Sequence, residues 1–200
     1  MRHVVVIGQT ADAAGAFSLE DIAGTSGRID VLVRCVRAAL CVSHGLRTDV
    51  VVDLVLLGGP RAPRTLRIEG ANARFIRPDE RSLATLLKKA LQADASGTTF
   101  VEVKPGVSVR DAGLSALLRE LDSATPLYVL DEDAPDIRSV AIEGGDVVLL
   151  IGDHRGFDDE SRAHARAAHA RPVSVGPISV HADDALTLAM NELDRVFAQR

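Results

Sequence analysis

The sequence lacks long hydrophobic runs and has few cysteines. No apolar run approaches the ~18 residues of a membrane-spanning helix, and the start, MRHVVVIG, is too short for a signal peptide. We therefore expect a soluble, cytoplasmic protein that makes no membrane contact. Cys35 and Cys41 are six residues apart on one predicted helix, which fits neither a disulfide nor a CxxC motif. They are expected to be small thiols of the core or of a half-exposed face.

Several motifs of catalysis and cofactor binding are also absent. The chain contains no GxGxxG, no GxxxxGK[ST] and no GxSxG, which argues against a dinucleotide site, a P-loop and the nucleophile turn of serine hydrolases. His164 and His169 are five residues apart, and no HxxE or HExxH spacing occurs, so no metal site is expected. Two other histidines, His154 and His181, lie in loops at strand ends, where a functional role and a local hydrogen-bonding role both remain open.

Charge is unevenly distributed along the chain. The formal net charge is -5, but residues 1–100 hold 13 Lys+Arg against 10 Asp+Glu, whereas residues 101–200 hold 10 against 18. The total argues against broad, non-specific binding of nucleic acid. One interval, 61–81, nevertheless holds six arginines, whose guanidinium groups suit phosphate recognition as well as an ordinary solvated face.

The hydrophobic pattern predicts a single α/β domain over residues 1–200. Continuous apolar strands are predicted at 4–8, 50–58, 126–130, 146–152 and 172–176, and they alternate with helices after Ser26, Asp79 or Ser82, Asp111, Asp158 and Asp183. Such strands are typical of a mainly parallel sheet that helices cover on both faces. Short strands are also predicted around Pro105, and the alternating segments of residues 61–78 predict a small β-hairpin extension.

Three loops are expected to form one pocket. In an open α/β sheet, ligands bind beyond the carboxyl ends of the strands. Here those ends are residues 130–133, 152–157 and 174–179, and the last of them is interrupted by Gly176-Pro177. Glycines, free backbone groups and carboxylates suit a cationic or neutral ligand with a hydrogen-bonding ring better than a polyphosphate.

Four separated motifs carry a family resemblance over essentially the whole chain. They are GTSGRIDVLVRCVRAALCVSHG (24–45), RPDERS (77–82), LLIGDHRGF (149–157) and VSVGPISVHAD (173–183). In this order they closely resemble the TrmY family, the tRNA pseudouridine N1-methyltransferases of the SPOUT superfamily. The resemblance implies a C-terminal trefoil knot over about 126–200, a homodimer, S-adenosyl-L-methionine as cofactor, and methylation of N1 of a pseudouridine in the tRNA T-loop without a metal.

The resemblance also assigns roles to residues. The cofactor contacts would be Leu130, Gly152, Asp153, Ser174, Val175, Gly176, Pro177, Ile178, Ser179 and Ala185. The first helix is expected to approach the partner's cofactor pocket. Asp30 and Arg28 are the catalytic candidates, with Asp30 as proton acceptor, and Arg28 and Arg34 are expected to anchor the RNA. A simple helix brace between Asp30 and Arg34 is the competing interpretation. Arg77 and Arg81 are further RNA-binding candidates.

One position departs from the family pattern. Ala185 stands where the family commonly has a cysteine, two residues after the aspartate of its His-x-Asp element. Two alternatives therefore stay open: the same fold and cofactor acting on ribosomal RNA or another modified uridine, or a dimeric RNA- or cofactor-binding module with weakened catalysis.

Overall fold

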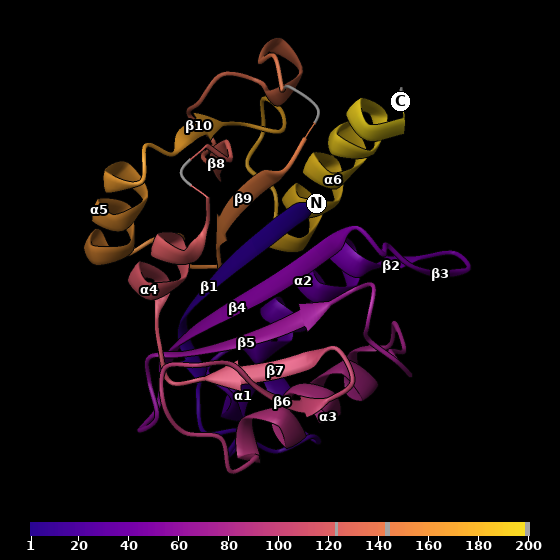
Figure 1. Ribbon diagram of the computed structural model, residues 1–200, viewed down its shortest axis with the longest axis vertical. Coiled ribbons are helices and arrows are strands. Elements are labelled where there is room, and N and C mark those ends of the chain that lie inside the picture. Colours follow the sequence, from indigo (N-terminus) through magenta and orange to yellow (C-terminus); the bar gives the residue numbers. More distant parts are fainter. Residues whose placement is uncertain (123, 143–144, 199–200) are drawn as a thin grey trace.

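An eight-stranded mixed sheet forms the centre of the protein (Figure 1). The structure is a computed structural model, which describes residues 1–122, 124–142 and 145–198. The strand order is β10-β8-β9-β1-β4-β5-β7-β6, and the pairs from β10 to β4 are parallel, whereas the pairs from β4 to β6 are antiparallel. The bounds are β1 Arg2–Asp12, β4 Val50–Gly58, β5 Arg64–Glu69, β6 Val101–Lys104, β7 Val107–Arg110, β8 Leu127–Leu130, β9 Val147–Gly152 and β10 Arg171–Val173.

Helices cover the parallel part of the sheet on both faces, as predicted. The helices are α1 Ile22–Thr25, α2 Ile29–Leu40, α3 Glu80–Gln92, α4 Leu114–Glu120, α5 Asp159–Ala167, α6 Ala182–Ala198 and the 3₁₀ helix η1 Ile137–Ser139. Side chains of α2, α3 and α6 share one core with Val4 and Val6 of β1, and side chains of α4 and α5 share another with Val5 and Ile7. A strand buried on both faces needs apolar residues at nearly every position, which explains why the strand sequences are continuous apolar stretches.

The start of α2 is pressed against the end of β1. Gly27 has a φ of 63°, and a Cβ there would lie 1.7 Å from the carbonyl oxygen of Thr10. The N-cap of α2 is Arg28, without a side-chain capping bond, and not Ser26 as predicted; the hydroxyl of Ser26 nevertheless accepts a hydrogen bond from the Ile29 N–H at 2.8 Å. These contacts place the first turn of α2 at the carboxyl edge of the parallel strands.

The C-terminal third has the predicted knotted arrangement. The connection between β8 and β9 carries η1, which contacts α6, and α6 also contacts β9 and packs on α2. Backbone hydrogen bonds join the same connection to the end of β10, from Ile137 N–H to Ser174 C=O and from Ser174 N–H to Pro135 C=O, both at 2.8 Å. The last helix therefore packs against the β8–β9 connection, and the end of β10 is bonded to the same connection.

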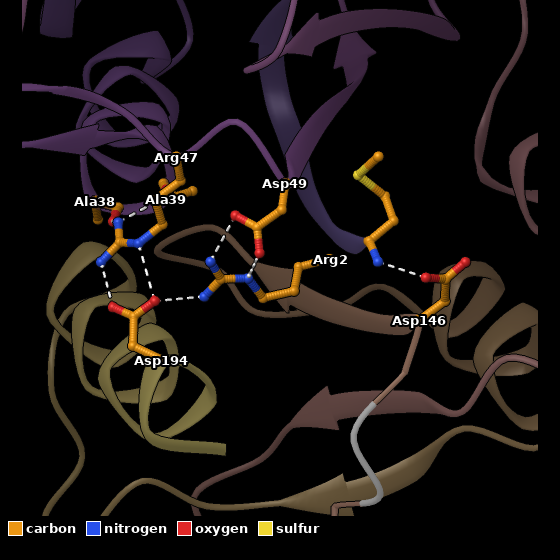
Figure 2. A network of polar contacts seen from close by, with 8 residues as sticks. Arg2, Ala38, Ala39, Arg47, Asp49, Asp146 and Asp194 are labelled. Atoms are coloured by element: carbon orange, nitrogen blue, oxygen red, sulfur yellow. Dashed lines mark hydrogen bonds and ion pairs between the residues drawn. The ribbon is translucent and has the colours of Figure 1, made fainter. Parts of the chain in front are cut away.

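A polar network ties α6 to the beginning of the chain (Figure 2). The guanidinium of Arg2, which is 4% exposed, donates to both carboxylate oxygens of Asp49 and also to Asp194 of α6. Arg47 donates to Asp194 at 2.7 Å and to the backbone carbonyls of Ala38 and Ala39 at the end of α2. One carboxylate thus links α6, β1 and α2.

The hairpin predicted over 61–78 is not formed there. Residues 64–69 form β5, which pairs with β4 and β7 inside the main sheet, and residues 73–78 contain no strand. A hairpin would need residues 73–78 to pair with one edge of β5, but β4 and β7 occupy both edges. The alternating pattern of a segment does not by itself say which strand it pairs with. A small hairpin extension does exist at β2 (Cys41–Val42) and β3 (Gly45–Leu46), and it projects from the body of the protein (Figure 1).

Two local predictions also need correction. Asp111 does not cap α4, whose N-cap is Gly113; its carboxylate instead forms an ion pair with Arg64 at 3.0 Å. The last strand ends at Val173, three residues before Gly176. None of the helices in the described ranges is long and apolar enough to cross a membrane.

Candidate functional site

A cleft of about 1090 Å³ lies at the carboxyl ends of β8, β9 and β10. The three loops predicted to converge, at 130–133, 152–157 and 174–179, all contribute to its lining. The first turns of α2 and α6 form its remaining wall. Its size is at the upper end of the ~300–1,000 Å³ typical of small-molecule sites, so the cleft has room for a cofactor and part of a second reactant.

Nearly all the residues proposed as cofactor contacts lie in this lining. They are Leu130, Gly152, Asp153, Ser174, Val175, Gly176, Ile178, Ser179 and Ala185. Pro177 is exposed and is not part of the lining. The strand-end argument and the family resemblance therefore point to one place in the structure.

The loop after β10 presents unused backbone donors to the cleft. Ser174 is held on both sides by the β8–β9 connection. Among the described residues, no acceptor of the chain receives the N–H groups of Val175, Gly176, Ile178 or Ser179. Backbone donors left free at a concave surface are suited to bind a hydrogen-bonding ligand.

Asp153 shapes the neighbouring loop. Its carboxylate is fully buried and accepts hydrogen bonds from the backbone N–H groups of Gln9 and Arg155, both at 2.8 Å. A Cβ at Gly152 would lie 2.4 Å from the carbonyl oxygen of Gly156, so the loop folds back closely on the end of β9. Asp153 therefore holds the loop in place, and its carboxylate oxygens are already engaged.

Asp30 joins the two arginines that line the cleft from α2. Its oxygens accept hydrogen bonds from Arg28 at 2.9 and 3.1 Å and from Arg34 at 3.0 Å. The Asp30 side chain is 5% exposed and is not part of the cleft lining, whereas Arg28 and Arg34 are. Burial by itself would raise the pKa of Asp30, but the hydrogen bonds from Arg28 and Arg34 outweigh it and lower this pKa.

The backbone of Arg28, at the edge of the cleft, is strained. Arg28 has a φ of 71°, in the left-handed region that non-glycine residues seldom adopt. Such residues persist only where their surroundings hold them, and they gather at functional sites. In this structure the strained residue directs its guanidinium toward Asp30 and the cleft.

Sequence reasoning missed the residue that completes this group. Asp183, in the first turn of α6, lies 3.4 Å from Nε of Arg34 and also lines the cleft. Val31 of α2 and Arg162 of α5 line the cleft as well. An acidic first turn directly after a strand-end loop was the available signal for Asp183, since it places carboxylates at the strand ends.

Other predicted residues lie elsewhere or in a different setting. Arg77, in the segment that leads into α3, and Arg81, in the first turn of α3, are exposed and do not line the cleft. His154 and His181 both line it, but the His181 side chain is 91% exposed. Arg28 and Arg34 reach the cleft of their own chain, and an approach to a partner's cleft stays a prediction.

Ala185 is half-buried, lines the cleft and packs against the core shared by α2 and α6. A methyl group at this point leaves the backbone of the neighbouring loop intact. Cys35 is buried, and burial raises the pKa of its thiol, so it is an inert core residue. No group of three or more His, Cys, Asp or Glu placed to hold a metal occurs in the described part of the chain.

Comparisons with known families, proteins and structures each match nearly the whole chain. The family model described as "Putative SAM-dependent RNA methyltransferase" matches residues 1–198. Proteins named tRNA (pseudouridine(54)-N(1))-methyltransferase from Methanosarcina mazei and Methanosarcina acetivorans are each 44% identical over 200 residues, which are 100% of this chain and 94% of each relative. The crystal structure of Archaeoglobus fulgidus Nep1 bound to S-adenosylhomocysteine superposes with a TM-score of 0.66 at 15% identity, covering 98% of both chains.

Proposed function

Since the chain belongs to this SAM-dependent RNA methyltransferase family, we propose that it methylates N1 of a pseudouridine in the T-loop of tRNA. The observation that carries this function is the strand-end cleft, in which free backbone donors face two arginines held by one buried carboxylate. The archaeal relatives of the same name extend over the whole chain, including every loop of that cleft.

The cleft fits the proposed cofactor. The free N–H groups of Val175, Gly176, Ile178 and Ser179 suit a hydrogen-bonding ring. Carboxylates at the rim suit a positively charged ligand; they are Asp131, Glu132, Asp133, Asp183 and Asp184. When bound, S-adenosyl-L-methionine supplies an electrophilic methyl group on a sulfonium sulfur. The loops at 130, 152 and 174–179 would hold it.

Side chains at the start of α2 are placed to bind the RNA substrate. Arg28 and Arg34 carry forked donors that match phosphate and base oxygens, and Asp30 and Asp183 restrict their rotation. Fixing these donors before RNA binds reduces the entropy lost when the target base is oriented for transfer. In this arrangement Arg28 and Arg34 bind and orient the RNA.

The role of proton acceptor for Asp30 stays a prediction. A carboxylate whose pKa is lowered by two arginines is a weak base, and both of its oxygens already accept hydrogen bonds. We therefore favour a positioning role, in which Asp30 acts through Arg28 and Arg34.

A homodimer is the proposed working unit. Three large apolar side chains are left in water on the last loop and on α6: Ile178 is 74% exposed, Leu188 44% and Val180 41%. Exposed apolar residues that gather on one part of a surface mark interaction sites. We also propose that the protein works in the cytoplasm, on tRNA as its partner.

The function can be tested with two matched T-arm RNAs, one with pseudouridine and one with uridine at the target position. We expect transfer of a radioactive methyl group from S-adenosyl-L-methionine to the pseudouridine RNA alone. Equal labelling of both RNAs would contradict the specificity for pseudouridine. Labelling of neither, with cofactor binding intact by calorimetry, would favour a non-catalytic binding module.

A further inference from the structure

Phe75 is held in an unusual conformation with its ring in water. Its side chain is 90% exposed, more than any other large apolar side chain in the described ranges. Its φ is 58°, in the left-handed region that aromatic residues rarely adopt. An exposed ring on a strained backbone contributes nothing to the chain's own core, so its contribution is expected in a complex.

The ring lies in a basic segment of an acidic protein. Residues 74–89 contain five Lys and Arg but only Asp79 and Glu80 as acids, in a chain with a net charge of -5. The Asp79 carboxylate is used as the cap of α3, where it accepts a hydrogen bond from Ser82 N–H at 2.8 Å. Lys88 donates to the backbone carbonyl of Phe17, and the positive charges of the other basic side chains, Arg74, Arg77, Arg81 and Lys89, are only partly balanced by Asp79 and Glu80.

A groove of about 350 Å³ adjoins the ring. Phe75 is part of its lining, and residues of α3 and β6 supply most of the rest, including Lys89 and Lys104. An aromatic face beside two ammonium groups combines the features that bind single-stranded nucleic acid, a surface for base stacking and cations for the phosphates.

The first turn of α3 lies between this groove and the candidate active site. Arg34, which lines the cleft, lies 3.9 Å from Glu80 in the first turn of α3. Ser82, two residues further along the same turn, already lines the groove.

We propose that Phe75 and the basic side chains around it form a second RNA contact, outside the cleft. The ring stacks on an unpaired base of the tRNA, and the arginines and lysines beside it neutralise the neighbouring phosphates. This inference rests on the proposed function, because it assumes that the substrate is tRNA. It adds a recognition surface that is separate from the residues that hold the cofactor and the target base.

Replacement of Phe75 tests the contact. We expect Phe75→Ala to weaken the binding of pseudouridine-containing tRNA about 5- to 100-fold in the presence of S-adenosylhomocysteine, because one stacked base is lost. The kcat at saturating tRNA should be unchanged. Phe75→Trp should bind within about twofold of the unmodified protein, because an indole ring also stacks.

The contribution of the basic side chains can be measured separately, from the salt dependence of tRNA binding. Arg77→Ala should reduce the slope of log binding constant against log salt concentration by about one, because one phosphate contact is lost. Val42→Ala, which removes another exposed apolar side chain from the β2–β3 hairpin, is the matched control and should bind tRNA normally.

Two results would overturn the proposal: tRNA binding by Phe75→Ala equal to that of the unmodified protein, or a change in oligomer mass in this variant, which would make the ring a contact between subunits. Failure of the proposed function is a different outcome. In that case the unmodified protein would transfer no methyl group, while the effect of Phe75 on tRNA binding could still be measured.

Discussion

At the scale of single residues, a carboxylate controls the candidate active site without lining it. Asp30 is almost fully buried, yet it fixes Arg28 and Arg34 at the mouth of the cleft. The interpretation of Asp30 and Arg34 as a simple helix brace is partly correct, since the ion pair is present. The structure adds Arg28 and Asp183, which extend the pair into a network at the cleft.

Asp30→Asn separates a positioning role from a catalytic one. Asn keeps one acceptor but loses the charge that holds two arginines, so we expect KM for tRNA to rise about tenfold with kcat nearly unchanged and the pH dependence of kcat unaltered. General base catalysis is worth ~10²–10⁴ in rate, so a loss of that size in kcat would instead identify Asp30 as the proton acceptor. Measurement of kcat and of KM for tRNA from pH 6 to 9 distinguishes the two roles. Glu160→Gln, an exposed carboxylate of α5, is the control.

At the scale of elements, one side chain adds polar contacts from two arginines to the packing of α6 on the rest of the protein. Asp194 accepts hydrogen bonds from both Arg2 and Arg47 (Figure 2). Burial by itself would raise the pKa of Asp194, but the hydrogen bonds from Arg47 and Arg2 outweigh it and lower this pKa. The helix that forms part of the cleft therefore depends on an ion pair about ten residues away along the chain from Asp183.

Asp194→Asn should reveal this link in urea unfolding. At pH 7 we expect the variant to be less stable by about 1 kcal/mol, because Arg2 and Arg47 lose their shared partner. A lowered pKa in the folded state gives stability that is present above the unfolded pKa of ~3.9 and is lost as pH falls through the folded pKa. The difference between the two proteins should thus be constant from pH 8 to 5 and shrink below about pH 4. Asp184→Asn, on the exposed side of α6, should show no such difference.

At the scale of the whole molecule, the apolar residues near the cleft indicate assembly. Ile178 and Val180 are exposed on the last loop, where they line the cleft, and Leu188 is exposed on α6 outside the lining. If this surface joins two chains, the cleft lies close to the interface and the partner helps to close it. The exposed Phe75 lies on a different part of the surface, near α3, and is assigned to RNA.

Leu188→Asp tests the dimer without altering the lining of the cleft. We expect the unmodified protein to have the mass of two chains by light scattering. The variant should have the mass of one, because a buried unpaired carboxylate costs several kcal/mol. Val42→Asp, on the β2–β3 hairpin, should remain dimeric. A single-chain mass for the unmodified protein at micromolar concentration would contradict the proposal.

Much of the fold was readable from local patterns. Val50 to Gly58 was predicted as a buried strand and is one, because a strand covered on both faces has no place for polar side chains except Asp53, which pairs with Arg67. The strand-end rule located the cleft, since parallel strands bring their carboxyl ends to one edge wherever the chain crosses over. The four motifs identified the family.

Tertiary structure alone decided which distant groups meet. Arg34 and Asp183 are far apart in the sequence, yet knotting brings α6 against α2 and places them 3.4 Å apart. Residues 64–69 had the alternation of a hairpin strand, but they pair with β4 and β7 because those edges were free in the folded sheet. Local patterns depend on neighbours a few residues away, whereas pairing depends on which faces and edges remain open when the whole chain has folded. For that reason the sequence by itself determined the elements, the family and the place of the cleft, and only the folded chain decided which side chains control it.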